Sequence, residues 1–188
     1  MPFIGDPSKP VEIEIRALDA TGADVPVTAG ADLAMIFPPQ GGRVAFVGVR
    51  AKNLDPCAVR LLGAVRDPSS KQVRLDARTV NLVAKDGYGV TGTGNTDVTS
   101  DVAIAAYSNV PLCPNQWAEE SVFDHTFELE VDVTDHGGRH ANAKVLVTPR
   151  CAEPAREAQC KCLCKKGYVL GEACGEDAGV PLEAGSGG

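Results

Sequence analysis

The sequence has few aromatic residues and little concentrated positive charge, and each shortage excludes a class of function. Phe, Trp and Tyr make up 5% of the 188 residues, and Trp117 is the single tryptophan, so no broad aromatic binding face is expected. Lys and Arg form no cluster beyond the segment Lys161–Lys166, and the formal net charge is -7. Because phosphate contacts need cations, nucleic acid is not an expected partner.

Long apolar runs, a leader and catalytic motifs are missing as well. No apolar run approaches the roughly 20 residues that span a bilayer, so no transmembrane segment is expected. Residues 1–10 contain three prolines and predict an extended lead-in, and they lack the basic and then apolar regions of a signal peptide. No nucleophile elbow occurs. The sequence does not decide whether the protein is an enzyme, but it favours a protein without catalytic activity.

One segment matches a cofactor-binding motif but lacks the helix that the motif requires. Residues 87–92 match G-x-G-x-x-G, the glycine pattern of dinucleotide-binding loops. Such a loop needs a helix directly after it, whose N-terminus receives the pyrophosphate. The following residues, TGNTD, do not predict a helix. We therefore expect a flexible loop and no cofactor.

Cysteine is abundant and unevenly distributed. Cys57 and Cys113 stand alone in the main body. A disulfide between them would close a long loop and would therefore stabilise the folded chain by roughly 4 kcal/mol. The other cysteines crowd into residues 151–174, a segment too short to bury a core of its own, which predicts a disulfide-stapled tail in an oxidising compartment. The disulfide candidates are Cys57, Cys113, Cys151, Cys160, Cys162, Cys164 and Cys174.

This cysteine usage favours an exported protein, in the periplasm, at the cell surface or outside the cell, whose leader is absent from this sequence. The count of seven cysteines is odd. At least one thiol is therefore expected to be left over, and it could link two copies of the chain into a homodimer.

The segment from Phe127 to Thr148 gives the strongest architectural signal. Residues 127–133 alternate apolar and acidic side chains, residues 135–139 contain two glycines, and residues 141–147 alternate again. Alternation with a period of two is typical of strands with one dry and one wet face. The segment predicts a long antiparallel hairpin with its apolar face on a core.

Short segments rich in β-formers, separated by turn residues, predict an all-β sandwich over residues 11–150. A cysteine-rich stapled tail over residues 151–174 is expected to follow, with a short helix near residues 153–159, and then a disordered tail or linker over residues 175–188. The expected strands are residues 11–16, 31–37, 43–52, 57–65, 72–75, 79–83 and 102–107, and the expected loops are residues 84–101 and 108–117.

The hairpin resembles the closing hairpin of extracellular immunoglobulin-like modules, among them the PKD, cadherin-like and bacterial Ig-like families. This resemblance implies an immunoglobulin-like antiparallel β-sandwich and an extracellular habit, but no particular chemistry. It is carried by the pattern Phe127-x-Leu129-x-Val131-x-Val133-Thr134-Asp135-x-x-Gly138 and the following Ala141-x-Ala143-x-Val145-x-Val147.

The tail resembles a second family. Residues 162–174, CLCKKGYVLGEAC, are similar to the C-terminal half of an EGF-like module, C-x-C-x-x-G-Y…C. The resemblance implies a bond between Cys164 and Cys174. The upstream cysteines, Cys151 and Cys160, depart from the spacing of that family, so a minimal hairpin stapled in the same manner is expected instead of a full EGF-like domain.

Three candidate sites remain open. Asp86, Asn95, Asp97 and Asp101 could supply oxygen ligands for Ca²⁺, which takes about six to eight of them. The pattern Cys160-x-Cys162-x-Cys164 could bind a soft metal ion, although structural zinc sites usually place about two to four residues between cysteines. Acidic residues near Trp117, namely Glu119, Glu120 and Asp124, could form a hydrolase site. Tyr88 and Trp117 are candidate binding residues.

Taken together, these patterns favour a non-catalytic exported binding or structural module of a bacterial cell-surface or lipoprotein-like kind, with a protein or cell-surface partner. A metal-binding protein that uses the tail cysteines and a hydrolase are the alternatives.

Overall fold

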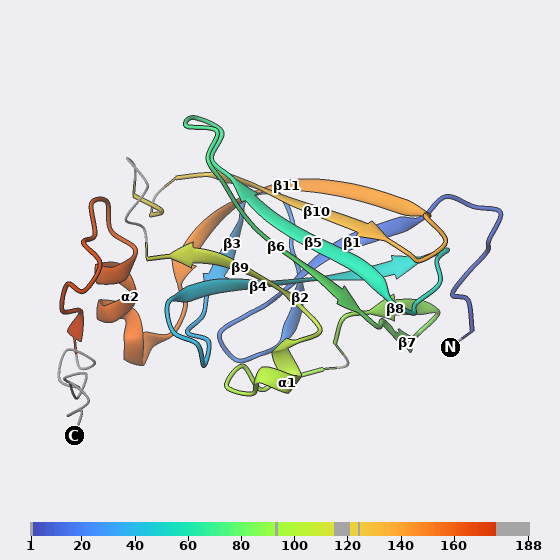
Figure 1. The fold of residues 1–188 in the computed structure, drawn as a ribbon, viewed down its shortest axis with the longest axis horizontal. Coiled ribbons are helices and arrows are strands. Elements are labelled where there is room, and N and C mark those ends of the chain that lie inside the picture. Colours follow the sequence, from blue (N-terminus) through green and yellow to red (C-terminus); the bar gives the residue numbers. More distant parts are fainter. Residues whose placement is uncertain (1, 93, 115–120, 124, 176–188) are drawn as a thin grey trace, which may run out of the picture.

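The structure, a computed structural model, describes residues 2–92, 94–114, 121–123 and 125–175. Strands dominate, so the fold is all-β as predicted, with a short helical appendage, residues 152–175, at one end (Figure 1). The elements are β1 Glu12–Leu18, β2 Asp24–Pro26, β3 Ala31–Met35, β4 Arg43–Lys52, β5 Val59–Arg66, β6 Val73–Val80, β7 Val83–Lys85, β8 Tyr88–Val90, α1 Asp101–Ile104, β9 Ser108–Cys113, β10 Phe127–Thr134, β11 His140–Cys151, the 3-10 helix η1 Pro154–Arg156 and α2 Glu157–Leu163.

The strands form two sheets that share one core. One sheet has the order β2-β1-β4-β8-β7, with β9 also paired to β4, and the other has the order β3-β11-β10-β5-β6. Buried residues of both sheets, such as Val47 and Leu129, belong to a single apolar cluster. The predicted sandwich is therefore confirmed. The pairing departs from a purely antiparallel one at β3, which runs parallel to β11.

The predicted hairpin is confirmed as β10 and β11. They pair from Phe127 opposite Val147 to Thr134 opposite His140. Leu129 and Val131 on the inner face are 0% exposed, and burial of such a side chain stabilises the fold by about 1.5–3 kcal/mol. The acidic residues of β10 lie on the outer face, among the side chains that face solvent.

β4 is the central strand of its sheet, as its apolar residues on both faces predicted. It pairs with β1, β8 and β9, and Ala45, Phe46 and Val47 are all 0% exposed. Gly48 is required by close packing, because a Cβ atom there would lie 2.1 Å from the hydroxyl oxygen of Thr91.

Several segments differ from the prediction. Residues 88–90, inside the expected loop 84–101 and the G-x-G-x-x-G match, form the strand β8, which pairs with β4 and β7. Residues 102–107 were expected to form a strand, but α1 begins there because the Ser100 hydroxyl accepts a hydrogen bond from the Ala103 amide (3.4 Å) and caps its first turn. Residues 108–113, expected to be a loop, form the edge strand β9 instead. Pro111, which has no N–H to donate, sits next to an irregularity in the pairing with β4, where a proline is tolerated.

The predicted bridge between Cys57 and Cys113 is wrong. Cys113 lies opposite Arg43 at the start of β4, whereas Cys57 follows the far end of the same strand. The length of β4 separates these two ends by about 30 Å, and a disulfide requires Cα atoms within about 7 Å. Cys57 keeps a thiol, and Cys113 bonds to Cys164.

The pairing of Cys164 with Cys174, which the EGF-like resemblance implied, is wrong as well, because Cys174 bonds to Cys162. The third disulfide joins Cys151 and Cys160. None of the helices in the described residues is long and apolar enough to cross a membrane.

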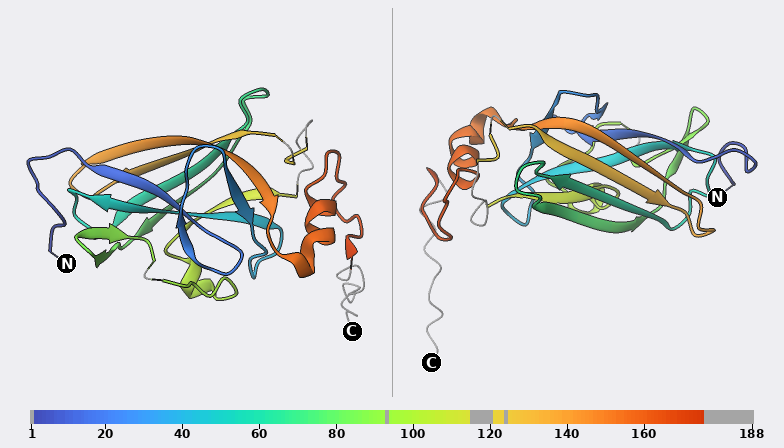
Figure 2. Two further views of the ribbon diagram at one scale, coloured as in Figure 1. Left: turned by 180° about the vertical axis from the view of Figure 1, so that it is seen from behind. Right: turned by 90° about the horizontal axis from the view of Figure 1, so that it is seen from above.

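The N-terminal segment, residues 2–10, lies at the end of the sandwich opposite the appendage (Figures 1 and 2). The guanidinium of Arg139 donates hydrogen bonds to the carbonyl oxygens of Pro7 (2.6 Å) and Asn53 (3.0 Å). The side-chain amide of Asn53 donates to the carbonyl of Pro10 (2.8 Å). Hydrogen bonds to the backbone thus hold this segment in place.

Candidate binding cleft

The helix α2 sets the directions of the three cysteine side chains at positions 160, 162 and 164. Residues four apart in a helix lie on one face, whereas the residue midway between them lies on the other side. Cys160 and Cys164 accordingly face the sandwich together and are 2% and 0% exposed. Cys162 is half-buried on the other side of the helix and bonds to Cys174 within the appendage.

Two disulfides fasten α2 to the sandwich, one to each sheet. Cys164 bonds to Cys113 at the end of β9, with Cα atoms 5.1 Å apart, and Cys160 bonds to Cys151 at the end of β11, with Cα atoms 5.9 Å apart. The thioether sulfur of Met35 lies 4.0 Å from the sulfurs of Cys113 and of Cys164, so the first bridge is buried in the core. The position of α2 is therefore fixed relative to both sheets.

A buried arginine adds a second attachment beside the disulfides. Arg43 is 0% exposed, and its Nη1 atom lies 2.9 Å from a carboxylate oxygen of Glu153. Its Nη2 atom donates to the side-chain oxygen of Gln159 (2.7 Å) and to the carbonyl of Arg156 (3.2 Å). The guanidinium groups of Arg43 and Arg156 lie 5.0 and 4.2 Å from the ring centroid of Phe37. These contacts anchor η1 and α2 on the sandwich end.

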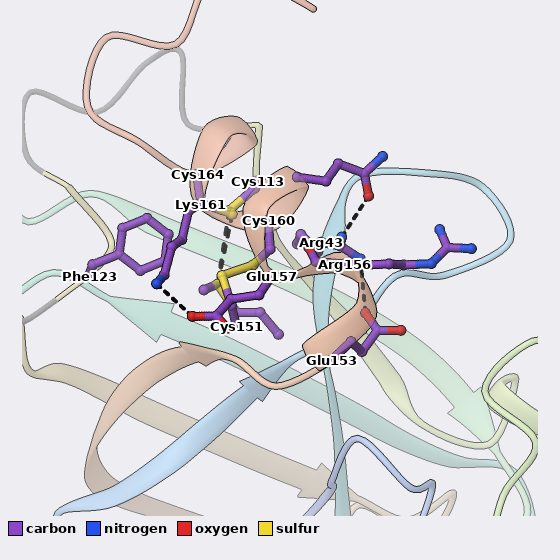
Figure 3. The surroundings of a disulfide bond; sticks show 12 residues. Arg43, Cys113, Phe123, Cys151, Glu153, Arg156, Glu157, Cys160, Lys161 and Cys164 are labelled. Atoms are coloured by element: carbon purple, nitrogen blue, oxygen red, sulfur yellow. Dashed lines mark hydrogen bonds and ion pairs between the residues drawn. A yellow bond between two sulfur atoms is a disulfide. The ribbon is translucent and has the colours of Figure 1, made fainter. Parts of the chain in front are cut away.

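A cleft of about 480 Å³ lies between α2, the end of β11 and the segment before β10. Figure 3 shows Phe123 and the ion pair of Lys161 with Glu157 on one side of the bond between Cys151 and Cys160, and the buried Arg43 on the other. The cleft thus has an apolar part, the Phe123 ring and the disulfide, and a mainly cationic part. Among the described residues, its lining consists of Phe123, Arg150, Cys151, Glu157, Lys161 and Lys165.

Each cation of the cleft has a carboxylate close by. Lys161 lies 2.5 Å from Glu157, four residues before it on α2. Arg150 lies 3.3 Å from Asp32, outside the lining. Lys165 pairs with Glu172, also outside the lining. The hydrogen bond from Lys165 holds the pKa of the Glu172 carboxyl below its usual value, against a smaller opposite effect of burial. The three cationic side chains are 44–62% exposed, so water reaches all of these pairs.

Tyr88, a predicted binding residue, lies away from this cleft. Two cations lie over its ring, with the Arg50 guanidinium carbon 3.6 Å and the Lys52 ammonium 4.1 Å from the centroid. A smaller hollow of about 190 Å³ lies next to it, and its lining includes Arg50 and Asp24. Since Arg50 and Lys52 already contact the Tyr88 ring, this residue does not offer an open stacking surface.

The calcium hypothesis concerned Asp86, Asn95, Asp97 and Asp101. The Asp97 carboxylate accepts hydrogen bonds from the amide (2.9 Å) and hydroxyl (2.6 Å) of Thr99 in its own turn, and Asp101 accepts one from Gln40. Asp86 lines the smaller hollow near Tyr88. Within the part of the chain that the structure describes, no group of three or more His, Cys, Asp or Glu residues is placed to hold a metal ion.

The structure bears on the hypothesised soft-metal site of the tail cysteines but does not describe the residues of the hypothesised hydrolase site. Cys160, Cys162 and Cys164 each bond to a different partner cysteine, and a disulfide sulfur is not the thiolate that binds a soft metal ion. The residues of the hydrolase hypothesis lie outside the described residues, as does the second predicted binding residue: Glu119, Glu120, Asp124 and Trp117.

One sequence signal points to the cleft, namely the Lys161–Lys166 segment, where three lysines cluster. Phe123 carries no such signal, because the fold brings it to α2 from a distant position in the sequence.

In the comparisons with known proteins, no family model, no curated protein and no solved structure matches this chain. The immunoglobulin-like and EGF-like resemblances therefore stay predictions, and the candidate site rests on the geometry of the cleft.

Proposed function

We propose that this chain is an exported, non-catalytic binding module of a bacterial cell surface, and that it holds its partner in the cleft between α2 and β11. The observation that carries the proposal is the attachment of the cleft walls. Two disulfides join α2 to both sheets, so the cleft exists before a partner arrives. A preformed site avoids part of the ordering cost of binding, which favours affinity.

The disulfides also support export. Six of the seven cysteines form three intramolecular disulfides, and such bonds form and persist mainly in oxidising compartments. The resemblance of the β10–β11 hairpin to extracellular immunoglobulin-like modules supports the same location.

The lining of the cleft favours binding over catalysis. Among the described residues it combines an aromatic ring, cations and one carboxylate, and its cysteine is in a disulfide. Nucleophilic catalysis would need a nucleophile next to a base that activates it. The described lining residues offer surfaces for contact instead.

Intact mass measurement on the chain isolated from its own host tests the export half of the proposal. After alkylation in denaturant without reductant, we expect three retained disulfides and one alkylated thiol, at Cys57. Five or more alkylated thiols would show that the disulfides do not form in the compartment where the protein works, and export would be ruled out.

Selection of displayed random peptides on the oxidised chain tests the binding half. We expect selected peptides to bind the wild type and to lose affinity for a chain with Lys161→Ala and Lys165→Ala. Lys144→Ala is the matched control, because Lys144 is 47% exposed and lies 2.8 Å from Glu128, but on the outer face of the sandwich. Peptides that bind all three chains equally would place binding outside the cleft.

A further inference from the structure

We infer that the cleft takes an acidic peptide segment that carries an apolar side chain, so that carboxylates meet the cationic rim while the apolar group enters beside Phe123. This inference rests on the proposed function and names the class of ligand. The rim is formed by the charged ends of Arg150, Lys161 and Lys165.

The local charge of the cleft differs in sign from the charge of the whole chain. Among the residues that the structure describes, the lining contains three cations and one carboxylate, Glu157, whereas the chain carries a formal charge of -7. At physiological ionic strength charges are screened beyond about 8 Å, so a ligand in the cleft senses the nearby cations more than the distant acidic residues. The cleft is thus a cationic site on an acidic protein.

The existing ion pairs of the rim do not prevent a ligand carboxylate from binding. Lys161 and Glu157 are 62% and 50% exposed, and Lys165 and Glu172 are 44% and 35% exposed. Exposed pairs of this kind contribute only about 0–1 kcal/mol. An ammonium group also has three N–H donors, so it can bind a second carboxylate while it keeps the first. Exchange or sharing of these pairs therefore costs little.

The apolar part of the cleft adds a second contribution to ligand binding, besides the charge of the rim. The Phe123 ring and the disulfide of Cys151 with Cys160 supply apolar surface. The aliphatic stems of Lys161 and Lys165 add to it, because lysine buries its stem and keeps its ammonium in water. A leucine-sized side chain buried here would add hydrophobic stabilisation of about 25 cal/mol per Å² of apolar surface removed from water.

A peptide fits these features better than an anionic membrane does. The cations surround a hollow, and the bond between Cys151 and Cys160 lies at its wall, so a flat lipid surface would reach the rim without filling the cleft.

The test uses the oxidised full chain and a fluorescein-labelled peptide of glutamates with one central leucine, followed by fluorescence anisotropy. We expect binding that weakens as salt is added and that falls by about tenfold or more in the double variant Lys161→Glu and Lys165→Glu, since two attractive contacts become repulsive. Lys144→Glu, the matched control, should bind as the wild type does. The counterpart peptide of lysines with one leucine should prefer the double variant.

Two further probes separate the parts of the inference. Replacement of the leucine by serine should weaken binding to the wild type, and equal binding would remove the apolar side chain from the inference. Vesicles of phosphatidylcholine with phosphatidylglycerol should not bind. If the vesicles bind to the chain whereas the peptide does not, the inference is overturned in favour of a membrane.

The outcome also separates the inference from the proposed function. If peptides selected from a random library depend on Lys161 and Lys165 but carry no excess of acidic residues, the cleft is a binding site and the ligand class is wrong. If neither the selected nor the acidic peptides depend on these lysines, both proposals fail.

Discussion

The two ends of the sandwich hold their attached segments by different chemistry. At the appendage end, the bond between Cys113 and Cys164 and the buried pair of Arg43 with Glu153 join η1 and α2 to the strands. At the opposite end, the N-terminal segment is held by hydrogen bonds in which side chains such as Arg139 donate to backbone carbonyls. One end depends on covalent bonds and buried charge, the other on polar contacts close to water.

This difference makes the two ends respond differently to reductant. Reductant removes the bonds of the appendage end, whereas the N-terminal end contains no disulfide among its described residues, and Cys57 there keeps a thiol. At the N-terminal end, acid acts on two carboxyl groups. The carboxyl groups of Asp6 and Asp55 both have a pKa below the usual value, because they accept hydrogen bonds from Ser8 and from the Cys57 amide.

The largest effect is expected from the double variant Cys113→Ala and Cys164→Ala. The bond spans 51 residues, and its removal should lower the free energy of unfolding by about 4 kcal/mol because the unfolded chain regains the entropy of the open loop. Urea unfolding under oxidising conditions measures the loss. The control, Cys162→Ala with Cys174→Ala, opens a loop of 12 residues inside the appendage and should leave the unfolding of the sandwich nearly unchanged. Equal losses in the two variants would contradict the view that the bond between Cys113 and Cys164 stabilises the sandwich more than a bond within the appendage does.

Removal of the carboxylate that faces Arg43 should have the next largest effect. Glu153→Ala removes a carboxylate that lies 2.9 Å from a guanidinium that is 0% exposed, which should cost about 3 kcal/mol. The double variant Arg43→Met and Glu153→Leu should recover most of the stability, because an apolar pair of similar size often replaces a buried ion pair at little cost. A double-mutant cycle of urea midpoints measures the coupling, and additive losses would contradict an interaction between the two residues.

The sandwich was predictable because its central elements carry local patterns. The alternation of residues 127–147 predicted β10 and β11, and the apolar residues on both faces of residues 43–52 predicted β4. Residues 102–107 were mistaken for a strand because a short apolar run is compatible with a helix, and the cap at Ser100 selects the helix. Strand order and the parallel β3 depend on packing between distant segments, which no local pattern encodes.

The disulfides and the cleft were predictable only in part. The abundance of cysteines predicted a stapled tail, but their pairing depends on which strand ends meet in space. The helical spacing of Cys160 and Cys164 would have placed both on one face, if the expected short helix had been extended over them. The cluster Lys161–Lys166 indicated positive charge, whereas the contribution of Phe123 follows from the tertiary fold alone.

At the N-terminal end, Asn53→Ala should have an intermediate effect. Asn53 is 4% exposed, donates to the carbonyl of Pro10 (2.8 Å) and accepts from the amide of Asp6 (3.0 Å). Loss of both hydrogen bonds to the N-terminal backbone should cost about 2 kcal/mol, less than the loss of Glu153. Asn142→Ala is the control, because its exposed hydrogen bond to Glu130 (3.0 Å) should contribute no more than about 0.5 kcal/mol. A loss at Asn53 as small as that at Asn142 would show that the N-terminal segment adds little to stability.

The smallest effect is expected from protonation of two carboxyl groups at the N-terminal end. Asp6 and Asp55 have a lower pKa in the folded chain than their usual value, so they add stability above that value and lose it as the pH falls through the folded pKa. The double variant Asp6→Asn and Asp55→Asn should therefore unfold at a lower urea concentration than the wild type at pH 6, and the difference should shrink below about pH 4. The variant without the bond of Cys113 and Cys164 should keep the same pH dependence as the wild type, because these carboxyl groups lie at the other end of the sandwich. If the difference between the aspartate variant and the wild type stays constant from pH 6 to pH 3, these two carboxyl groups are not the source of acid sensitivity, and the contrast between the two ends would rest on their response to reductant alone.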